Sequence, residues 1–262
     1  MIVENSFQYN EGTKPLLISM PHNASLIPEA VACGMTKEAQ QSKDTDWFMD
    51  RLYDFAPTLG VHTLKPSWSR FYIDLNRDPK GANLYPGADS TELCPTSDFA
   101  NQALYLDGNS PNQDEIEQRT AKAWQPYHQC IETVLQKMVA DHGYAILFDA
   151  HSIRSRVPRF FDGQLPDFNF GTADGKSCDD AHLKAVQQLD FDDWSKVSNG
   201  RFKGGYITRH YGRPDLNIHA IQLEMSQAIY LDEANLSWDE QKAAPVKVQL
   251  QRIIQALLDC HG

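Results

Sequence analysis

Short, mostly apolar runs that end in polar residues recur along this chain. Three of them are Leu16 to Met20, Ala145 to Phe148 and Ala220 to Leu223. Runs of four or five such residues predict buried β-strands. In an open α/β sheet, ligands bind just beyond the carboxyl ends of the strands. The polar residues that follow these three runs are therefore the first candidates for chemistry.

Apolar residues spaced three and four positions apart predict helices between these strands. The expected helices cover roughly 44–56, 112–142 with a kink at Pro126, 181–189 and 243–261. Further strands are expected at 61–64, 71–75 and 205–208. Strands that alternate with helices indicate an α/β sheet. The stretches 79–111 and 152–179 are predicted to be long loops, which in compact domains are often functional.

Composition and charge narrow the class of protein. A chain of 262 residues with 41% hydrophobic residues is expected to form one domain, 1–262. Its net charge of −11 argues against nucleic acid or an anionic membrane as a partner and favours a small molecule. An anionic substrate would need local arginines. The five scattered cysteines, the lack of a long apolar run and the lack of a signal-like N-terminus predict a cytoplasmic protein, whose oligomeric state the sequence leaves open.

Two histidines and one carboxylate next to the strands predict a metal site. His22 follows the first run, and His151 follows the second, two residues after Asp149. A carboxylate such as Asp149 commonly orients a metal-binding imidazole, although it could instead cap a turn. Two histidines and a carboxylate with an open position make a hydrolytic zinc site. Asp44 and Asp46 both open an expected helix; Asp44 suits the N-cap, so Asp46 is the preferred third ligand.

Glu224 follows the third run, where burial would raise the pKa of its carboxyl toward neutrality. That makes it the best candidate for a general base. The alternative from this segment alone is a structural salt bridge with an arginine.

Arg70 and Arg77 flank the expected strand 71–75, and a guanidinium suits either carboxylate binding or oxyanion stabilisation. Because they stand at opposite ends of that strand, both can reach one site only if the strand bends or is short, and Arg77 at the carboxyl end has the better position. Asp74 and Asp78 could simply neutralise them. The segment 200–212 mixes glycines with cationic and aromatic residues but lacks the context of a nucleotide-binding loop, so it is expected to bind substrate.

Taken together, these motifs resemble the N-formylglutamate amidohydrolase family over nearly the whole chain. The resemblance rests on the following segments: Pro21 to Ala24, Asp44 to Trp47, Ser69 with Arg70, Asp74 to Pro79, Asp149 to Ser152, Gly204 to Arg209 and Gln222 to Met225. The family is related to zinc exopeptidases and aspartoacylases, which implies a three-layer αβα sandwich with a mixed sheet and a metal-activated water. The relatives have His-x-x-Glu where this chain has Ser25 three residues after His22, so Asp46 is taken as the ligand instead.

The resemblance also implies the roles of the site residues. His22, Asp46 and His151 would bind Zn²⁺ or another divalent metal, and Glu224 would be the general base. Arg70 would stabilise the oxyanion, while Asn76, Arg77 and Arg209 would hold the substrate carboxylates. The implied reaction is hydrolysis of N-formyl-L-glutamate to formate and L-glutamate, a step of histidine degradation. Two alternatives remain open: hydrolysis of another N-acyl amino acid, and a non-catalytic protein that binds dicarboxylates.

Overall fold

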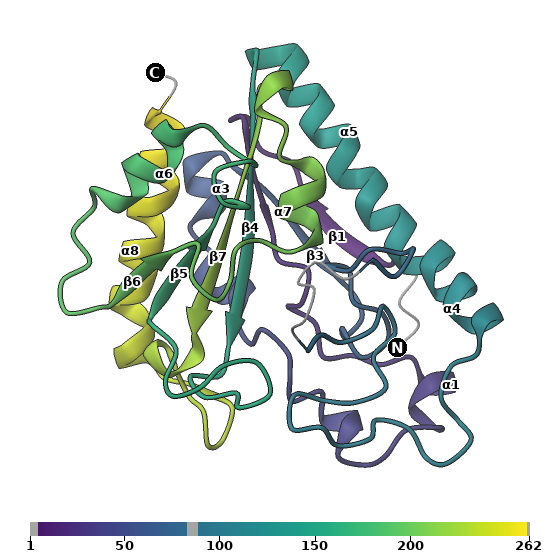
Figure 1. Cartoon of the computed structure of the whole chain (residues 1–262). Helices are drawn as coiled ribbons and strands as arrows, with labels where there is room; N and C mark the ends of the chain where they lie inside the picture. Colours follow the sequence, from purple (N-terminus) through teal and green to yellow (C-terminus); the bar gives the residue numbers. More distant parts are fainter. Residues whose placement is uncertain (1–4, 83–88, 261–262) are drawn as a thin grey trace.

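The computed structural model describes residues 5–82 and 89–260, which form a mixed β-sheet with helices on both faces (Figure 1). Within these ranges the main sheet has seven strands in the order β1-β3-β2-β4-β7-β5-β6. Their bounds are β1 Phe7–Asn10, β2 Leu16–Ser19, β3 His62–Pro66, β4 Ala145–Ile153, β5 Phe168–Gly171, β6 Lys196–Ser198 and β7 Ile218–Ser226. β1 runs antiparallel to β3 and β5 antiparallel to β7, while the other neighbours are parallel. The predicted mixed α/β sheet is confirmed.

Two hydrophobic layers form because successive residues of a strand point to opposite faces of the sheet. On β4, Ile146 and Phe148 join the layer that contains the buried residues of α8, whereas Ala145 and Leu147 join the layer that contains those of α5. Figure 1 shows α6 and α8 over one face and α5 and α7 over the other, which gives three layers. The helices are α1 Glu29–Ala32, α2 Met49–Leu52, α3 Ala56–Leu59, α4 Gln113–Arg119, α5 Gln125–His142, α6 Asp180–Gln187, α7 Tyr206–Tyr211 and α8 Glu240–Asp259. A small hairpin joins β8 Leu231–Asp232 to β9 Ser237–Trp238.

The two central strands are longer than the sequence suggests. β4 and β7 each have nine residues, all buried, and they pair in parallel along their whole length. The predicted positions of Asp149, His151 and Glu224 beyond the strand ends are therefore wrong, since all three lie inside the ladder. The apolar runs stop early because these positions near the carboxyl ends carry polar side chains, but the backbone hydrogen bonds continue.

Two expected strands are not strands. The segment 71–75 is a series of turns, because Asp74 Oδ1 accepts the Asn76 N–H at 2.9 Å and Ser69 Oγ accepts the Phe71 N–H at 3.1 Å. Side-chain bonds of this kind compete with a β-ladder for the backbone. The segment 205–208 begins helix α7, whose Ile207 and Tyr211 lie four residues apart on one buried face.

The expected helix over 44–56 is replaced by a loop and two single turns, α2 and α3. The Asp46 N–H donates to His22 O at 3.1 Å, so this backbone is tied to the loop after β2 instead of to a helix. Phe48 then has φ 60°, a left-handed conformation that interrupts a right-handed helix. Likewise, the expected loop 152–179 contains the end of β4 and all of β5.

The long helix predicted over 112–142 is present, with an irregular turn inside it. It comprises α4, a π-helical turn over Thr120–Trp124, and α5. Asn112 and Glu115 form a capping box at its start. The irregular turn lies just before Pro126. Proline has no N–H and so cannot donate the backbone hydrogen bond of a regular α-helix. Of the helices in 5–82 and 89–260, not one is long and apolar enough to cross a membrane.

Candidate functional site

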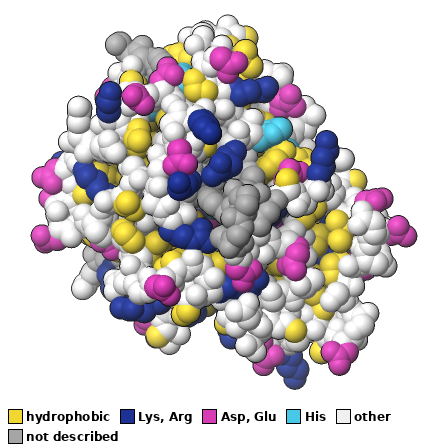
Figure 2. All heavy atoms as spheres, viewed as in Figure 1, with side chains coloured by type: hydrophobic (Ala, Val, Ile, Leu, Met, Phe, Trp, Pro, Cys, Tyr) yellow, Lys and Arg dark blue, Asp and Glu magenta, His cyan; other side chains and the backbone are white. Residues whose placement is uncertain are grey.

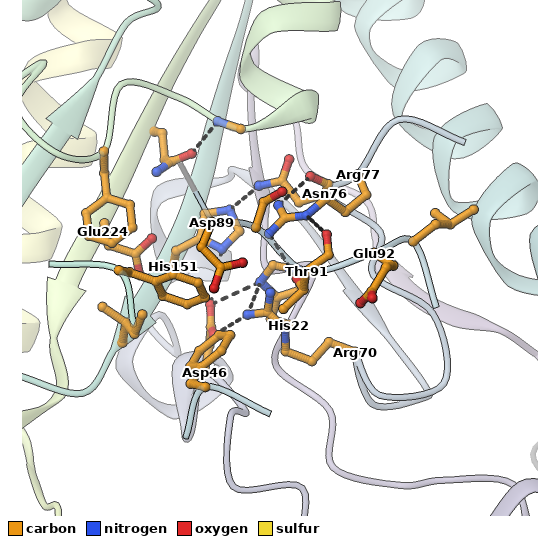
Figure 3. A pocket seen from close by; sticks show the side chains of 18 of the residues that line it. His22, Asp46, Arg70, Asn76, Arg77, Asp89, Thr91, Glu92, His151 and Glu224 are labelled. Carbon is orange, nitrogen blue, oxygen red and sulfur yellow. Dashed lines mark hydrogen bonds and ion pairs between the residues drawn. The ribbon is translucent and has the colours of Figure 1, made fainter. Parts of the chain in front are cut away.

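A cavity of about 300 Å³ opens near the carboxyl ends of β2, β4 and β7. Figure 3 shows side chains from the loops after β2 and β3 pointing into it beside side chains from the two central strands. Its described lining includes His22, Asp46, Arg70, Asn76, Arg77, Thr91, Phe99, His151, Phe160, Arg201, Phe202, Gln222 and Glu224. Most of the residues predicted to carry chemistry therefore meet in one place. If these residues were unrelated helix caps and surface salt bridges, they would lie far apart. They line one cavity instead.

The two histidines and Asp46 form a compact buried group. Asp46 Oδ2 lies 3.1 Å from His151 Nδ1 and 3.7 Å from His22 Nδ1, and the two imidazole rings are 4.9 Å apart. One ligand atom from each of the three residues lies within 4.8 Å of the others. Burial alone would raise the pKa of Asp46, but hydrogen bonds and charge from His151 and His22 outweigh it and hold the pKa below its usual range. The carboxylate therefore stays ionised although it is buried.

A second carboxylate lies against the other nitrogen of each histidine. His22 Nε2 is 2.7 Å from Asp74 Oδ1, and His151 Nε2 is 3.0 Å from Asp149 Oδ1. Metal-binding histidines characteristically donate the N–H of the non-ligating nitrogen to a carboxylate, which fixes the ring and its tautomer. In both rings Nδ1 faces the side on which Asp46 lies. At His151 the Nε2 atom also lies 2.9 Å from Asn76 Nδ2, so Asp149 and Asn76 share this nitrogen. The predicted role of Asp149 agrees with this proximity, whereas Asp74 was expected only to neutralise arginines.

The donor set fits a divalent metal of the kind bound by mixed nitrogen and oxygen ligands. Two imidazole nitrogens and a carboxylate oxygen suit zinc, with ligand distances of about 2 Å. The group is buried and the carboxylates on the far nitrogens are in place. One contact would have to change: Arg70 Nη1 lies 3.3 Å from His22 Nδ1, and that nitrogen has one lone pair, so it cannot serve both the guanidinium and a metal.

Asp46, and not Asp44, belongs to this group. The side chain of Asp44 accepts the Phe99 N–H at 2.8 Å and so holds the loop after residue 89. It caps no helix, because the expected helix does not begin there. Burial raises the pKa of Asp44 to about 6. The Asp46 carboxylate also accepts the Ser152 N–H at 3.1 Å, which ties the loop before α2 to strand β4.

Glu224 lies directly across the ladder from His151, as the register of β4 and β7 pairs these two residues. Its side chain is 8% exposed, and burial raises the pKa of its carboxyl to about 8. Gln222, two residues earlier and thus on the same face of the strand, accepts the Gly205 N–H at 2.7 Å and lines the cavity. A buried carboxyl whose pKa lies near neutrality is suited to take up and release a proton.

Arg70 is buried beside the histidine group. Its Nη2 donates to Asp74 Oδ2 at 2.6 Å, and its guanidinium lies over the ring of Phe99 at 4.8 Å. Burial alone would lower the pKa of Arg70, but the charges of Asp74, Asp46 and Asp44 outweigh it and raise the pKa. A fixed cation at this position can stabilise a developing oxyanion.

Asn76 and Arg77 sit on the turns after Asp74, so both Arg70 and Arg77 reach the same cavity. The opposite-ends prediction is wrong because no strand separates them. Asn76 Nδ2 lies 2.9 Å from His151 Nε2, and Asn76 Oδ1 accepts the Ile207 N–H at 2.8 Å. Arg77 donates from Nε to Thr91 O at 3.0 Å and from Nη2 to Thr91 Oγ1 at 3.1 Å. Figure 3 shows both side chains at the same rim of the cavity.

The segment 200–212 reaches the cavity through three of its residues. Arg201, Phe202 and Gly205 are among the lining residues, whereas Arg209 is not; its Nε donates to Gly204 O at 2.8 Å. Gly205 cannot be replaced without a shift of its neighbours, because a Cβ there would lie 2.4 Å from Asn76 Nδ2.

Some residues of the cavity were not predicted from the sequence. Arg201 was not named as a site residue, although it lies in the expected substrate-binding segment. Thr91, Phe99 and Phe160 were not predicted to line the cavity either, because they lie in the long loops and follow no periodic pattern.

Cationic side chains gather near the middle of one face of the molecule in spite of the net charge of −11. Figure 2 shows several Lys and Arg side chains close together there, next to hydrophobic ones. A local cationic region of this kind attracts small anions against an acidic background.

The fold and the site together define a class. A mixed α/β sheet with a buried group that can bind a metal, a buried glutamate of raised pKa and a fixed arginine is typical of a metal-dependent hydrolase. The sequence model of the family described as N-formylglutamate amidohydrolase matches residues 14–231. The chain belongs to the N-formylglutamate amidohydrolase family.

Individual relatives agree with this assignment. The chain is 43% identical to an N-formylglutamate deformylase of Pseudomonas putida and 44% identical to one of Pseudomonas aeruginosa, in each case over 98% of this chain and 97% of the relative. Its fold matches the crystal structure of an N-formylglutamate amidohydrolase from Ralstonia eutropha with a TM-score of 0.79 at 22% identity, over 97% of both chains. It also matches a protein of Agrobacterium tumefaciens with a TM-score of 0.73 at 14% identity, over 97% of this chain and 95% of that one.

Proposed function

We propose that this protein hydrolyses N-formyl-L-glutamate to formate and L-glutamate, as the names of its Pseudomonas relatives indicate for them. The single observation that supports this most is the meeting of His22, Asp46, His151 and Glu224 in one buried cavity. Water adds to the formyl carbon, the C–N bond breaks, and one proton passes from the water to the leaving amine.

His22, Asp46 and His151 are the residues that would hold a divalent metal, and Zn²⁺ suits their donor atoms best. When bound, such a metal polarises a carbonyl and acidifies water. Asp74 and Asp149 keep the two imidazoles oriented through their Nε2 atoms. Both rings thus offer the same nitrogen, Nδ1, toward Asp46.

Glu224 acts as the general base. The ionised form of its carboxyl accepts a proton from the attacking water and returns it to the amine nitrogen, and burial, which raises the pKa to about 8, makes this carboxylate a stronger base than a solvent-exposed one. Arg70, held by Asp74, stabilises the oxyanion that forms on the formyl oxygen. These two residues lie on either side of the histidine group, which leaves the formyl group a place between base and cation.

Asn76 and Arg77 hold the substrate carboxylates in this proposal, whereas Arg209, which the resemblance implied for the same task, does not line the cavity and is left out. Arg77 lines the cavity, and its planar guanidinium can bind a carboxylate through two parallel hydrogen bonds. Phe99, Phe160 and Phe202 also line the cavity and limit the space beside the methylene groups of the substrate.

A formate-release assay tests the proposal. Purified protein is incubated with N-formyl-L-glutamate, N-formyl-L-aspartate and N-acetyl-L-glutamate, with and without a chelator, and the metal content is measured in parallel. We expect the fastest reaction with N-formyl-L-glutamate and its loss after chelation. Faster release of acetate from N-acetyl-L-glutamate would identify a deacylase instead. Tight binding of L-glutamate without turnover and without stoichiometric metal would identify a binding protein.

A further inference from the structure

The turns that carry Asp74, Asn76 and Arg77 pair with no strand of the described residues, although the Asp74 N–H donates to Leu93 O at 2.7 Å. In a sheet, ladder hydrogen bonds fix each residue, as they do for His151 and Glu224. Here three backbone carbonyls of the segment 72–77 instead accept hydrogen bonds from side chains of the long helix. Tyr72 O accepts from Arg119 Nη1 at 3.1 Å, Leu75 O lies 2.8 Å from His128 Nε2, and Arg77 O accepts from Trp124 Nε1 at 3.0 Å.

The π-helical turn explains how one helix presents all three side chains to one segment. In a regular α-helix of 3.6 residues per turn, residues five apart differ by about 140° around the axis and so face different directions. A π-turn has i→i+5 hydrogen bonds, which bring residues five apart close to the same face. Arg119 and Trp124 are five apart, with the turn Thr120–Trp124 between them. His128 follows Trp124 by four residues, one α-helical turn later.

Trp124 and His128 also fix each other. Their rings stack with centroids 3.7 Å apart and an interplanar angle of 21°. His128 Nδ1 lies 3.0 Å from the Tyr211 hydroxyl, so both nitrogens of this buried ring have partners. The N–H groups of Trp124 Nε1 and His128 Nε2 thus each point at one backbone carbonyl of the segment 72–77. The ring stacking and the contact with Tyr211 hold both side chains in this orientation.

We infer that Trp124 and His128 are positioning residues: they fix the backbone on either side of Asn76 and thereby set the position of the Asn76 and Arg77 side chains for substrate carboxylates. The carboxylate-binding part of this inference rests on the proposed function; the positioning of the backbone does not. Neither residue lines the described part of the cavity, so neither acts as a catalytic residue.

The substitution Trp124→Phe tests the inference because it removes one N–H and keeps an aromatic ring over His128. We expect the KM for N-formyl-L-glutamate to rise about tenfold, as for loss of one well-placed hydrogen bond, with kcat within about twofold. A neutral N-formylamine should be hydrolysed at the wild-type rate. Trp238→Phe is the matched control, because the Trp238 Nε1 also donates one hydrogen bond, to Glu240 Oε2 at 2.8 Å, at the surface.

His128 supplies a second variant pair. His128→Leu removes the donor to Leu75 O and should raise the KM, whereas His128→Gln keeps an N–H within reach and should restore most of the wild-type KM. If His128 served folding alone, both variants would be less stable, and the KM would not rise while kcat stayed near the wild-type value. Unchanged KM in Trp124→Phe and His128→Leu, or a fall in kcat with KM unchanged, overturns the inference.

Amide hydrogen exchange separates this inference from the proposed function. If the wild-type protein does not hydrolyse N-formyl-L-glutamate, the proposed function is wrong, but exchange at residues 72–78 still tests the backbone contacts. We expect faster exchange there in Trp124→Phe and in His128→Leu, and wild-type exchange in Trp238→Phe. Wild-type exchange over 72–78 in both test variants contradicts the inference whatever the activity.

Discussion

The two halves of the candidate site are held in place by different means. One half lies on the central strands, where His151 and Glu224 stand opposite each other in an unbroken parallel ladder. The other half lies on loops, where His22, Asp46 and Arg70 are fixed chiefly by hydrogen bonds between side chains. Figure 3 shows the labelled side chains of the two halves meeting side by side in the cavity.

The two halves are sensitive to different substitutions. A ladder bond is made by the backbone, so a substitution on β4 or β7 changes the chemistry and leaves the strand in place. The loop half depends on Asp74, which lies 2.7 Å from His22 Nε2 and accepts from Arg70 Nη2 at 2.6 Å. One side-chain change there alters the position of several others.

The largest effect is expected from His151→Ala. The substitution removes one of the three atoms that can bind a metal and leaves the backbone of β4 paired on both sides. We expect metal content and formate release to fall below detection while circular dichroism stays that of the wild type. His142→Ala, at an exposed position at the end of α5, is the control. A metal-replete, active His151→Ala protein would remove His151 from the proposed ligand set.

Glu224→Gln should separate chemistry from metal binding in the same half. The amide has nearly the same shape but takes no proton, so we expect kcat to fall about 10²- to 10⁴-fold, the usual contribution of a general base. Metal content should not change, because Glu224 is not one of the three ligand residues. Glu117→Gln, on the exposed side of α4, should be fully active. Loss of metal in Glu224→Gln would indicate that this residue is a ligand and not a base.

The sheet half could be predicted from the sequence because its signals are local and periodic. Apolar runs that end in Asp149, His151 and Glu224 mark buried strands whose polar ends face one edge, and neighbouring parallel strands bring such ends together. The exact strand ends could not be predicted, because ladder bonds depend on the length of the neighbouring strand. β4 continues to Ile153 because β7 continues to Ser226.

The loop half could be predicted only in its residue types. His22, Asp46, Arg70 and Arg77 were recognisable as chemistry-bearing residues, but their arrangement depends on contacts between distant parts of the chain. The mostly apolar segment 71–75 was expected to be a strand, but the Asp74 side chain instead binds Arg70 and His22. No local pattern indicates that Thr91 or Phe99 would reach the cavity from the long loop.

Arg77→Met tests the loop half with a smaller effect. We expect the KM for N-formyl-L-glutamate to rise about 10- to 100-fold with a modest change in kcat, since a hydrogen bond to a charged group contributes about 1.5–3 kcal/mol. Arg77→Lys should recover only part of the loss, because an ammonium group lacks the planar fork. Arg51→Met, which breaks a surface ion pair with Glu240, serves as the control. Equal losses for a neutral N-formylamine would indicate that Arg77 does not recognise a carboxylate.

The last effect concerns the helix that supports the loop half, and it is measured as stability and not as activity. Burial lowers the pKa of His128 to about 3, against about 6.5 in an unfolded chain. Between these two pH values the unfolded chain binds a proton that the folded protein does not. This residue therefore makes the free energy of unfolding fall as the pH is lowered from about 6.5 toward 3, by about 1.4 kcal/mol per pH unit.

The substitution His128→Gln tests this pH dependence, because glutamine does not titrate and the variant should lack this part of the slope. Urea unfolding of wild type and variant at pH 7, 6, 5 and 4 measures the difference, and His142→Gln, at an exposed position, should keep the wild-type slope. Parallel curves for wild type and His128→Gln would mean that the imidazole titrates equally in both states, and hence that it is not held between Leu75 O and Tyr211 in solution.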